Sequence, residues 1–86
     1  MKFERDDKKH FANKKKHGVG FEIADSFDWD GAVFVDDDAH NEERVLAYGH
    51  ATDGRGYVIV FTFRGDNIRI ISVRRFTAKE NRTYGY

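Results

Sequence analysis

The residues of this chain that could do chemistry are arginines in a strand-forming stretch and a histidine that follows three lysines. Four arginines lie in YVIVFTFRGDNIRIISVRR at 57–75, namely Arg64, Arg69, Arg74 and Arg75. A planar guanidinium donates hydrogen bonds to two phosphoryl oxygens at once, and arginines on a rigid hairpin are preorganised to do so. The pattern therefore predicts a surface for a polyanion. The alternative for Arg69 is an ion pair with Asp66 or Glu80, and for Arg75 simple solvation.

His17 is the best candidate for a general base. A histidine side chain titrates near pH 6.5, and the three lysines at 14–16 would bind phosphate and lower its pKa. Alternatively, His17 caps a helix that ends at Gly18 by bonding to free carbonyl oxygens. Glu43 is a competing base, and Arg44 beside it is either its ion-pair partner or a phosphate ligand.

Metal chemistry has little support in the remaining ionisable residues. His40 with the aspartates at 36–38 is a conceivable metal cluster, but we expect His40 and His50 to be surface residues. The chain has no cysteine, which excludes disulfides and thiolate metal sites. We therefore expect neither a metal nor a cofactor.

The length of the chain, 86 residues, predicts a single domain spanning 1–86. A chain of this size buries roughly 60 to 65% of its unfolded surface, which allows one modest core and a surface site rather than a deep cavity. Apolar residues at 40% and aromatic residues at 15% predict a folded globule despite the high charge. Without a visible signal peptide or long apolar run, we expect a cytoplasmic protein with no membrane contact.

Charge is distributed unevenly although the net charge is zero. Residues 1–17 carry seven bases and three acids (+4), residues 18–54 one base and ten acids (−9), and residues 55–86 seven bases and two acids (+5). Basic surfaces at both ends of the chain could attract a polyanion that the acidic middle repels. The alternative is that acidic and basic segments pair within the fold.

The arginines must be positioned by a β-hairpin. Val, Ile, Phe, Tyr and Thr dominate 57–63 and 68–73, and turn formers lie between them. If Gly65 and Asp66 form a two-residue turn, position 64 pairs with 67, 61 with 70 and 60 with 71. Strict alternation then places Ser72 and Arg74 on the face of Phe61, and Val73 on the opposite face with Arg64.

The other elements surround this hairpin. We expect a helix from Asp6 or Asp7 to Gly18, and a second helix in GFEIADSFDW at 20–29 with Gly20 as its N-cap. A short buried strand at 32–35 and a strand at 44–50 follow, and Thr77 with Glu80 forms a capping box for a last helix. Lys2 to Arg5 is an extended piece that would add at most an edge strand. The fold class is therefore α+β, with two N-terminal helices, a four-stranded mainly antiparallel sheet and a C-terminal helix.

Several segments together resemble the BrnT family of type II toxins. They are KHGVGFEIA at 16–24, EER at 42–44 followed by Gly49, TFRGDNIRIISVRR at 62–75, and Glu80 with Tyr84. The resemblance implies a RelE-like domain and a metal-independent ribonuclease. It also implies a ribbon-helix-helix (BrnA-like) antitoxin in a tight complex, for which a heterotetramer is one form. The chain departs from the family pattern at Arg5 to Asp7, Gly20, Ile23 and Phe76.

Cleaving RNA without a metal requires a base for the ribose 2′-hydroxyl, cations for the charge on phosphorus and an acid for the 5′-oxygen. Arg64 and Arg74 match arginines of the family, and with His17 and Glu43 they form the predicted catalytic set. The predicted substrate-binding residues are Lys15, Lys16, Arg44, Arg69, Arg75 and Tyr84.

Two questions remain open at this stage. The alternative function is a non-catalytic binding module of the same fold, either a ParE-like protein poison or an RNA-binding domain. The antitoxin is expected to cover the arginine hairpin with acidic and apolar residues. The alternative is that basic residues of the antitoxin bind the acidic stretch at 36–43 and leave the arginines exposed.

Overall fold

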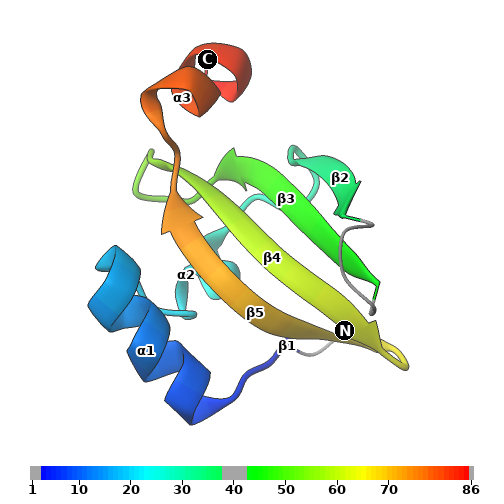
Figure 1. Ribbon diagram of the computed structural model, residues 1–86. Helices are drawn as coiled ribbons and strands as arrows, with labels where there is room; N and C mark the ends of the chain where they lie inside the picture. The colour runs from blue at the N-terminus through cyan, green and yellow to red at the C-terminus, as the bar shows by residue number, and fades with distance from the viewer. Residues whose placement is uncertain (1–2, 38–42, 86) are drawn as a thin grey trace.

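The computed structural model describes residues 3–37 and 43–85, which form an α+β fold (Figure 1). The elements in chain order are β1 (Phe3–Glu4), α1 (Asp7–His17), α2 (Ile23–Ser26), β2 (Val33–Asp37), β3 (Arg44–His50), β4 (Gly56–Arg64), β5 (Asn67–Arg75) and α3 (Ala78–Tyr84). The sheet order is β1-β5-β4-β3-β2, with β1 parallel to β5 and the other pairs antiparallel. The prediction of four strands is therefore wrong, because the short β1 adds a fifth strand and makes the sheet mixed.

The central hairpin contains a β-bulge that the strand alternation did not predict. The two-residue turn is confirmed, with Gly65 at φ 60° and Arg64 paired with Asn67. Phe61 pairs with Ile70 as predicted, but Val60 pairs with Ser72, so the predicted pairing of 60 with 71 is wrong. One extra residue on β5 reverses the faces of everything after it.

The bulge decides which face of the sheet receives Arg74. Val73 pairs with Ile59, and both side chains are fully buried, while Arg74 pairs with Val58. Without the bulge, Arg74 would enter the core and Val73 would be left on the other face. Burying a guanidinium without partners is far more costly than a local loss of pairing. The predicted placement of Ser72 and Arg74 beside Phe61 is therefore wrong.

The core lies between the sheet and the segment at 19–32, which crosses the face that we call the inner face. In Figure 1, α2 lies behind the sheet on this side. The segment buries Val19, Phe21, Ala24 and Phe27 against buried sheet residues such as Tyr57, Ile59, Phe61, Ile70 and Val73. The sheet side opposite α2 is the outer face.

The second helix is much shorter than predicted. It covers only Ile23–Ser26, and its N-cap is Glu22 rather than Gly20. Phe27 has extended backbone angles and forms a β-bridge with Ala51, so its backbone belongs to the edge of the sheet instead of a helix. The apolar residues of this segment recur at intervals that also suit a chain wrapping over the core, which is why helical spacing was misleading.

Helix α1 begins and ends as predicted. The Asp6 carboxylate accepts hydrogen bonds from the backbone N–H groups of Lys8 and Lys9, and Gly18 at φ 75° ends the helix. The helix lies beside the edge of β5 (Figure 1). At that edge the buried Asn13 side chain donates to the carbonyl of Val73 at 2.7 Å and accepts from its N–H at 3.1 Å. The side-chain amide thus takes the place of a neighbouring strand.

Strand β2 was predicted to be buried, and this is wrong. It pairs with β3 at one edge of the sheet, and Val33, Phe34 and Val35 are 47%, 50% and 41% exposed. An apolar run predicts burial only if another layer covers the strand, and an edge strand can lack that cover. No helix in the described part of the chain is long and apolar enough to cross a membrane.

Candidate functional site

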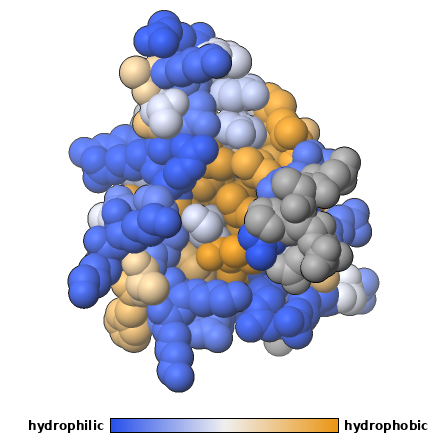
Figure 2. Space-filling view, in the orientation of Figure 1, coloured by the Kyte–Doolittle hydropathy of each residue, from blue (hydrophilic) through white to orange (hydrophobic). Residues whose placement is uncertain are grey.

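The outer face carries the side chains that alternate with the core. Residues opposite one another in the register share a face, so Tyr48, Val58 and Arg74 form one row across the sheet. Leu46, Val60 and Ser72 form the next row. Figure 2 shows an apolar area over the middle of this face, bordered by hydrophilic surface. This combination of exposed apolar surface and surrounding cations suits a ligand with both rings and phosphates.

A hollow of about 380 Å³ lies between α1 and the outer face. It is lined by Lys9, Ala12, Asn13, Lys16 and His17 from α1 and by Arg44, Ile71 and Ser72 from the sheet. Three predicted site residues therefore line the same hollow, although Lys16 and His17 end α1 and Arg44 begins β3. Because Asn13 fixes α1 to β5, the position of His17 over the sheet is fixed as well.

His17 lines this hollow in a cationic environment. Partial burial lowers the pKa of its imidazole below the usual value, and the positive charges of Lys16 and Arg74 lower it further. The imidazole is therefore neutral at pH 7 and has a lone pair that can accept a proton. Gly18 supplies the C-terminal cap of α1 by donating its N–H to the carbonyl of Lys14 at 2.8 Å.

Arg74 is held in place by the first turn of α3. Its Nη1 donates to Oε1 of Glu80 at 2.6 Å and its Nη2 to Oε2 at 2.8 Å, and Nη1 also contacts the carbonyl of Arg75 at 3.3 Å. This pair lowers the pKa of the Glu80 carboxyl to about 2. Glu80 thus pairs with Arg74 and not with Arg69. These hydrogen bonds use three of the five N–H donors of the guanidinium, so among the described residues two donors, including Nε, are left for a phosphate.

Glu80 has a second role that links Arg74 to the helix. Its Oε1 accepts the N–H of Thr77 at 2.9 Å, and its own N–H donates to the Thr77 hydroxyl at 3.2 Å. The predicted capping box is therefore confirmed. One carboxylate starts α3 and orients the arginine, so the two are structurally coupled.

An aromatic cluster forms the Arg74 end of the outer face. Tyr84 of α3 stacks on Tyr48 of β3, with ring centroids 4.5 Å apart and planes at 24°. Phe76 contacts both rings. Burial raises the pKa of the Tyr48 hydroxyl, so it stays protonated at neutral pH. Tyr84 is thus a packing residue of α3, and it also places a phenol near Arg74.

Other predicted residues lie farther from the hollow. Arg64 is exposed at the hairpin turn, six residues along β4 from the partner of Arg74, which corresponds to roughly 20 Å. Arg69 pairs with Thr62 on the outer face. Glu43 is exposed, and its carbonyl accepts the Thr62 hydroxyl at 2.5 Å. The structure therefore separates Arg64 from Arg74, and the outer face carries the two as ends of one surface.

Two of the predicted substrate-binding residues, Arg75 and Lys15, lie outside the hollow. Arg75 pairs with Tyr57, so it belongs to the inner-face side of β5. There the hydrogen bond from the Tyr57 hydroxyl lowers the pKa of Asp53, and the charge of Arg75 adds to this effect. Lys15 is exposed on α1 and does not line the hollow.

Sequence reasoning missed Asn13, Tyr48 and Ser72. Asn13 lies four residues before His17, on the same side of the helix, which was a usable signal. Tyr48 alternates with Arg44 and Leu46 along β3, which was also readable. Ser72 was assigned to the wrong face because of the bulge.

Within residues 3–37 and 43–85, no group of three or more His, Asp or Glu side chains is placed to hold a metal ion. The conceivable metal cluster of His40 with the aspartates at 36–38 is not tested, because His40 and Asp38 lie outside the described residues.

A family model described as "Ribonuclease toxin, BrnT, of type II toxin-antitoxin system" matches residues 6–80. A search of curated proteins found no match. Among solved structures, the 1.1 Å crystal structure of the Brucella abortus ribonuclease toxin BrnT is similar, with 24% identity and a TM-score of 0.71. The match covers 90% of this chain and 97% of that one, which shows a shared fold.

Proposed function

This chain belongs to the family of BrnT ribonuclease toxins of type II toxin-antitoxin systems, and we propose that it cleaves RNA without a metal ion at the hollow between α1 and the outer face. In this proposal the chain is a RelE-like endoribonuclease that acts in the cytoplasm. The observation that carries the proposal is that His17, whose imidazole pKa is lowered by burial and by neighbouring positive charges, lines one hollow with Lys16 and Arg44. A base and cations in one hollow supply two of the three roles that the reaction requires.

The proposed reaction begins with His17. Its neutral imidazole accepts the proton of a ribose 2′-hydroxyl, and the 2′-oxygen attacks the adjacent phosphorus. The bond from phosphorus to the 5′-oxygen then breaks. The products are a 2′,3′-cyclic phosphate and, after the leaving oxygen takes a proton, a 5′-hydroxyl. The phenols at the Arg74 end, Tyr48 and Tyr84, are the candidate donors of that proton, and Glu43 is the alternative base.

The cations stabilise the charge that develops on phosphorus. Arg74 is oriented by Glu80 before substrate arrives, so little reorganisation is needed when the charge appears. Lys16 and Arg44 line the hollow and bind the non-bridging oxygens. Lys15, Arg64 and Arg69 then extend the surface along the RNA backbone.

The decisive experiment is cleavage of end-labelled RNA by purified protein in excess EDTA. We expect cleavage to continue and to leave cyclic or 3′-phosphate ends. His17→Gln should lower the rate about a hundredfold or more, the usual contribution of a general base. Lys79→Gln on the exposed side of α3 is the control and should retain activity. Activity that EDTA abolishes and Mg²⁺ restores, or full activity of His17→Gln, contradicts the mechanism.

One observation favours a second candidate, a non-catalytic module of the same fold. The charge of Arg74 is already paired with Glu80, which suits a structural or purely binding role. The module would be either an RNA-binding domain or a ParE-like protein poison. Tight binding of RNA without cleavage, in the presence and absence of ribosomes, would favour the first of these.

The family implies an antitoxin partner, and we propose that it is a ribbon-helix-helix (BrnA-like) protein in a tight complex. A heterotetramer is the stoichiometry to test first. Co-expression with the protein encoded by the adjacent reading frame, followed by size-exclusion chromatography with light scattering, measures it. A monomeric toxin after co-purification would contradict a stable complex.

A further inference from the structure

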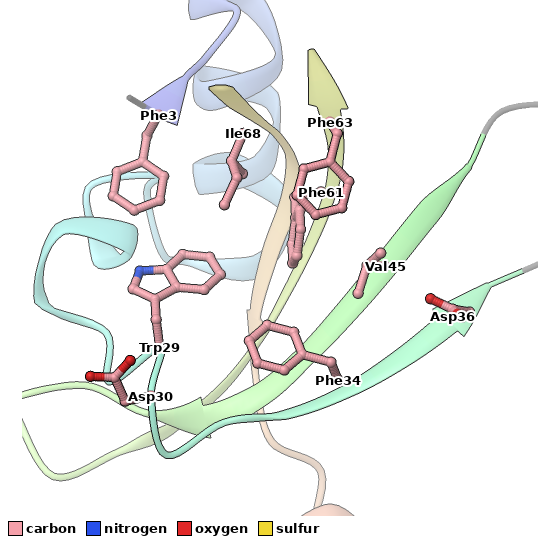
Figure 3. A pocket seen from close by; sticks show the side chains of 9 residues that line it. All are labelled: Phe3, Trp29, Asp30, Phe34, Asp36, Val45, Phe61, Phe63 and Ile68. Carbon is pink, nitrogen blue, oxygen red and sulfur yellow. The ribbon is translucent and has the colours of Figure 1, made fainter. Parts of the chain in front are cut away.

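A second, larger hollow lies on the inner face beyond the core. It has a volume of about 750 Å³, which is in the range of pockets that accept several apolar groups. Figure 3 shows the side chains that line it, from β1, the segment before β2, and the sheet itself. Aromatic rings dominate the lining, namely Phe3, Trp29, Phe34, Phe61 and Phe63. The proposed ribonuclease site, which lies on the outer face, does not use this hollow.

Three of the rings that line this hollow are exposed to solvent. Phe3, Phe34 and Phe63 are 37%, 50% and 53% exposed, and all three surround the same space. Phe34 and Phe63 also contact Phe61 edge to face, so the exposed rings continue directly into the core. Contiguous apolar surface of this kind marks an interaction site far more often than scattered exposed residues do.

Charge around the hollow restricts what can bind. Asp30 and Asp36 line it, and in Figure 3 they lie on either side of the rings. Both belong to the segment at 18–54, which carries ten acids and one base. The complementary surface is therefore a group of aliphatic or aromatic side chains flanked by lysines or arginines.

A second copy of the chain fits this hollow poorly. A two-fold contact would bring the hollow of one copy against the hollow of the other, and the aspartates of the two copies would then repel. A contact between the hollow and a different surface would leave a free hollow at each step unless the rotation closed a ring. The acidic rim therefore favours a different polypeptide, one that carries basic residues, as the occupant.

We infer that this hollow anchors an amphipathic, basic segment of the antitoxin. The inference rests on the proposed function for the existence of an antitoxin, and it adds where and by what chemistry that protein binds. The anchoring surface and Arg74 lie on opposite faces of the sheet. Asp36 lines the hollow and belongs to the acidic stretch at 36–43. The inference therefore agrees with the alternative in which basic residues of the antitoxin bind that stretch.

The first test removes the exposed rings. Phe34→Thr and Phe63→Thr keep side chains that suit strands, and the matched control Phe11→Thr removes a ring that is 67% exposed on α1, outside the hollow. Titration with the antitoxin should show about a tenfold or greater rise in Kd for the hollow variants and no change for the control. Equal Kd values for all three variants overturn the inference.

The second test reverses one charge and leaves the rings in place. Asp36→Lys should weaken the complex at low salt, with a smaller difference at high salt, whereas Asp7→Lys on α1 should not. If Arg74→Glu dissociates the complex while Asp36→Lys and the ring variants leave it intact, the antitoxin binds the outer face and the inference is wrong.

Trp29 supplies a direct signal, because it lines the hollow and is the only tryptophan of the chain. Toxin labelled with 5-fluorotryptophan should show a shift of its single ¹⁹F resonance when antitoxin is added. An unchanged resonance in a complex overturns the inference. If the wild-type chain forms no complex at all, the inference falls together with the proposed partner, whereas RNA cleavage by the free protein tests the ribonuclease function separately.

Discussion

At the scale of single residues, the protonation of His17 governs the proposed chemistry. Burial and the charges of Lys16 and Arg74 lower its imidazole pKa, so the base is active above that pKa and loses activity as pH falls through it. Cleavage should therefore have an acid limb with a midpoint below 6.5. NMR titration of the His17 ring should give the same midpoint. A midpoint above 6.5 would mean that these effects do not control the base.

Removing one of the two neighbouring charges should move that midpoint. Lys16→Gln is expected to raise the His17 pKa toward its ordinary value, because a nearby like charge disfavours the protonated ring. The rate at neutral pH should change little by this route alone, since the ring remains largely neutral there.

Glu80 is a residue with separable roles in stability and in positioning. Glu80→Gln weakens both the capping box and the pair with Arg74, whereas Thr77→Ala weakens only the cap. Thr77→Ala should cost about 1 kcal/mol of unfolding free energy and Glu80→Gln should cost more, both measured by urea denaturation. Only Glu80→Gln should also slow RNA cleavage. Equal activity of the two variants would show that Arg74 needs no orientation by α3.

The Glu80 carboxyl also predicts a pH dependence of stability. Its pKa falls from about 4.5 when unfolded to about 2 when folded. The unfolded chain therefore binds the proton more tightly, so the stabilisation is complete above pH 4.5 and is lost as pH falls toward 2. The stability of Glu80→Gln should lack this component across that window.

At the scale of elements, α1 is attached to the sheet through one side chain. Asn13 satisfies both backbone groups of Val73 and also bonds the carbonyl of Val19 at 3.0 Å. Asn13→Ala leaves these buried groups without partners and should cost about 1 to 3 kcal/mol. Lys14→Ala, an exposed neighbour, is the control. A loss below that range in urea denaturation would mean that water replaces the amide.

At the scale of the whole molecule, the outer face is a surface long enough for several nucleotides. Arg74 lies at the end where we propose that catalysis takes place, whereas Arg64 lies roughly 20 Å away at the hairpin turn. Arg74→Ala should lower kcat about a hundredfold. Arg64→Ala should chiefly raise KM and reduce the salt dependence of RNA binding by about one counterion. A hundredfold loss of kcat in Arg64→Ala would place the reacting phosphate elsewhere.

The opposite face is the surface that we propose for a protein partner. Its apolar hollow and acidic rim contrast with the cations of the outer face. Acidic residues therefore line the hollow of one face and basic residues line the hollow of the other. Some opposite charges also form ion pairs within the fold, as Arg74 does with Glu80. This arrangement allows RNA and a protein partner to be recognised by different chemistry.

The sequence by itself determined the features that depend on neighbouring residues. Asp6 and Gly18 set the bounds of α1, Gly65 set the hairpin turn, and Thr77 with Glu80 set the start of α3. Each of these rests on hydrogen bonds or backbone angles within a few residues, which a local pattern specifies. The family resemblance was likewise readable from short segments in order.

Only the tertiary structure decided which side chains meet. The bulge that turns Arg74 to the outer face exists because Val73 is buried more favourably than an arginine in the core, and alternation along one strand cannot show that competition. The parallel β1, the exposed β2 and the single turn of α2 likewise depend on which layer covers which strand. His17 lines the same hollow as Arg44 because Asn13 binds α1 to an edge that lies sixty residues away along the chain.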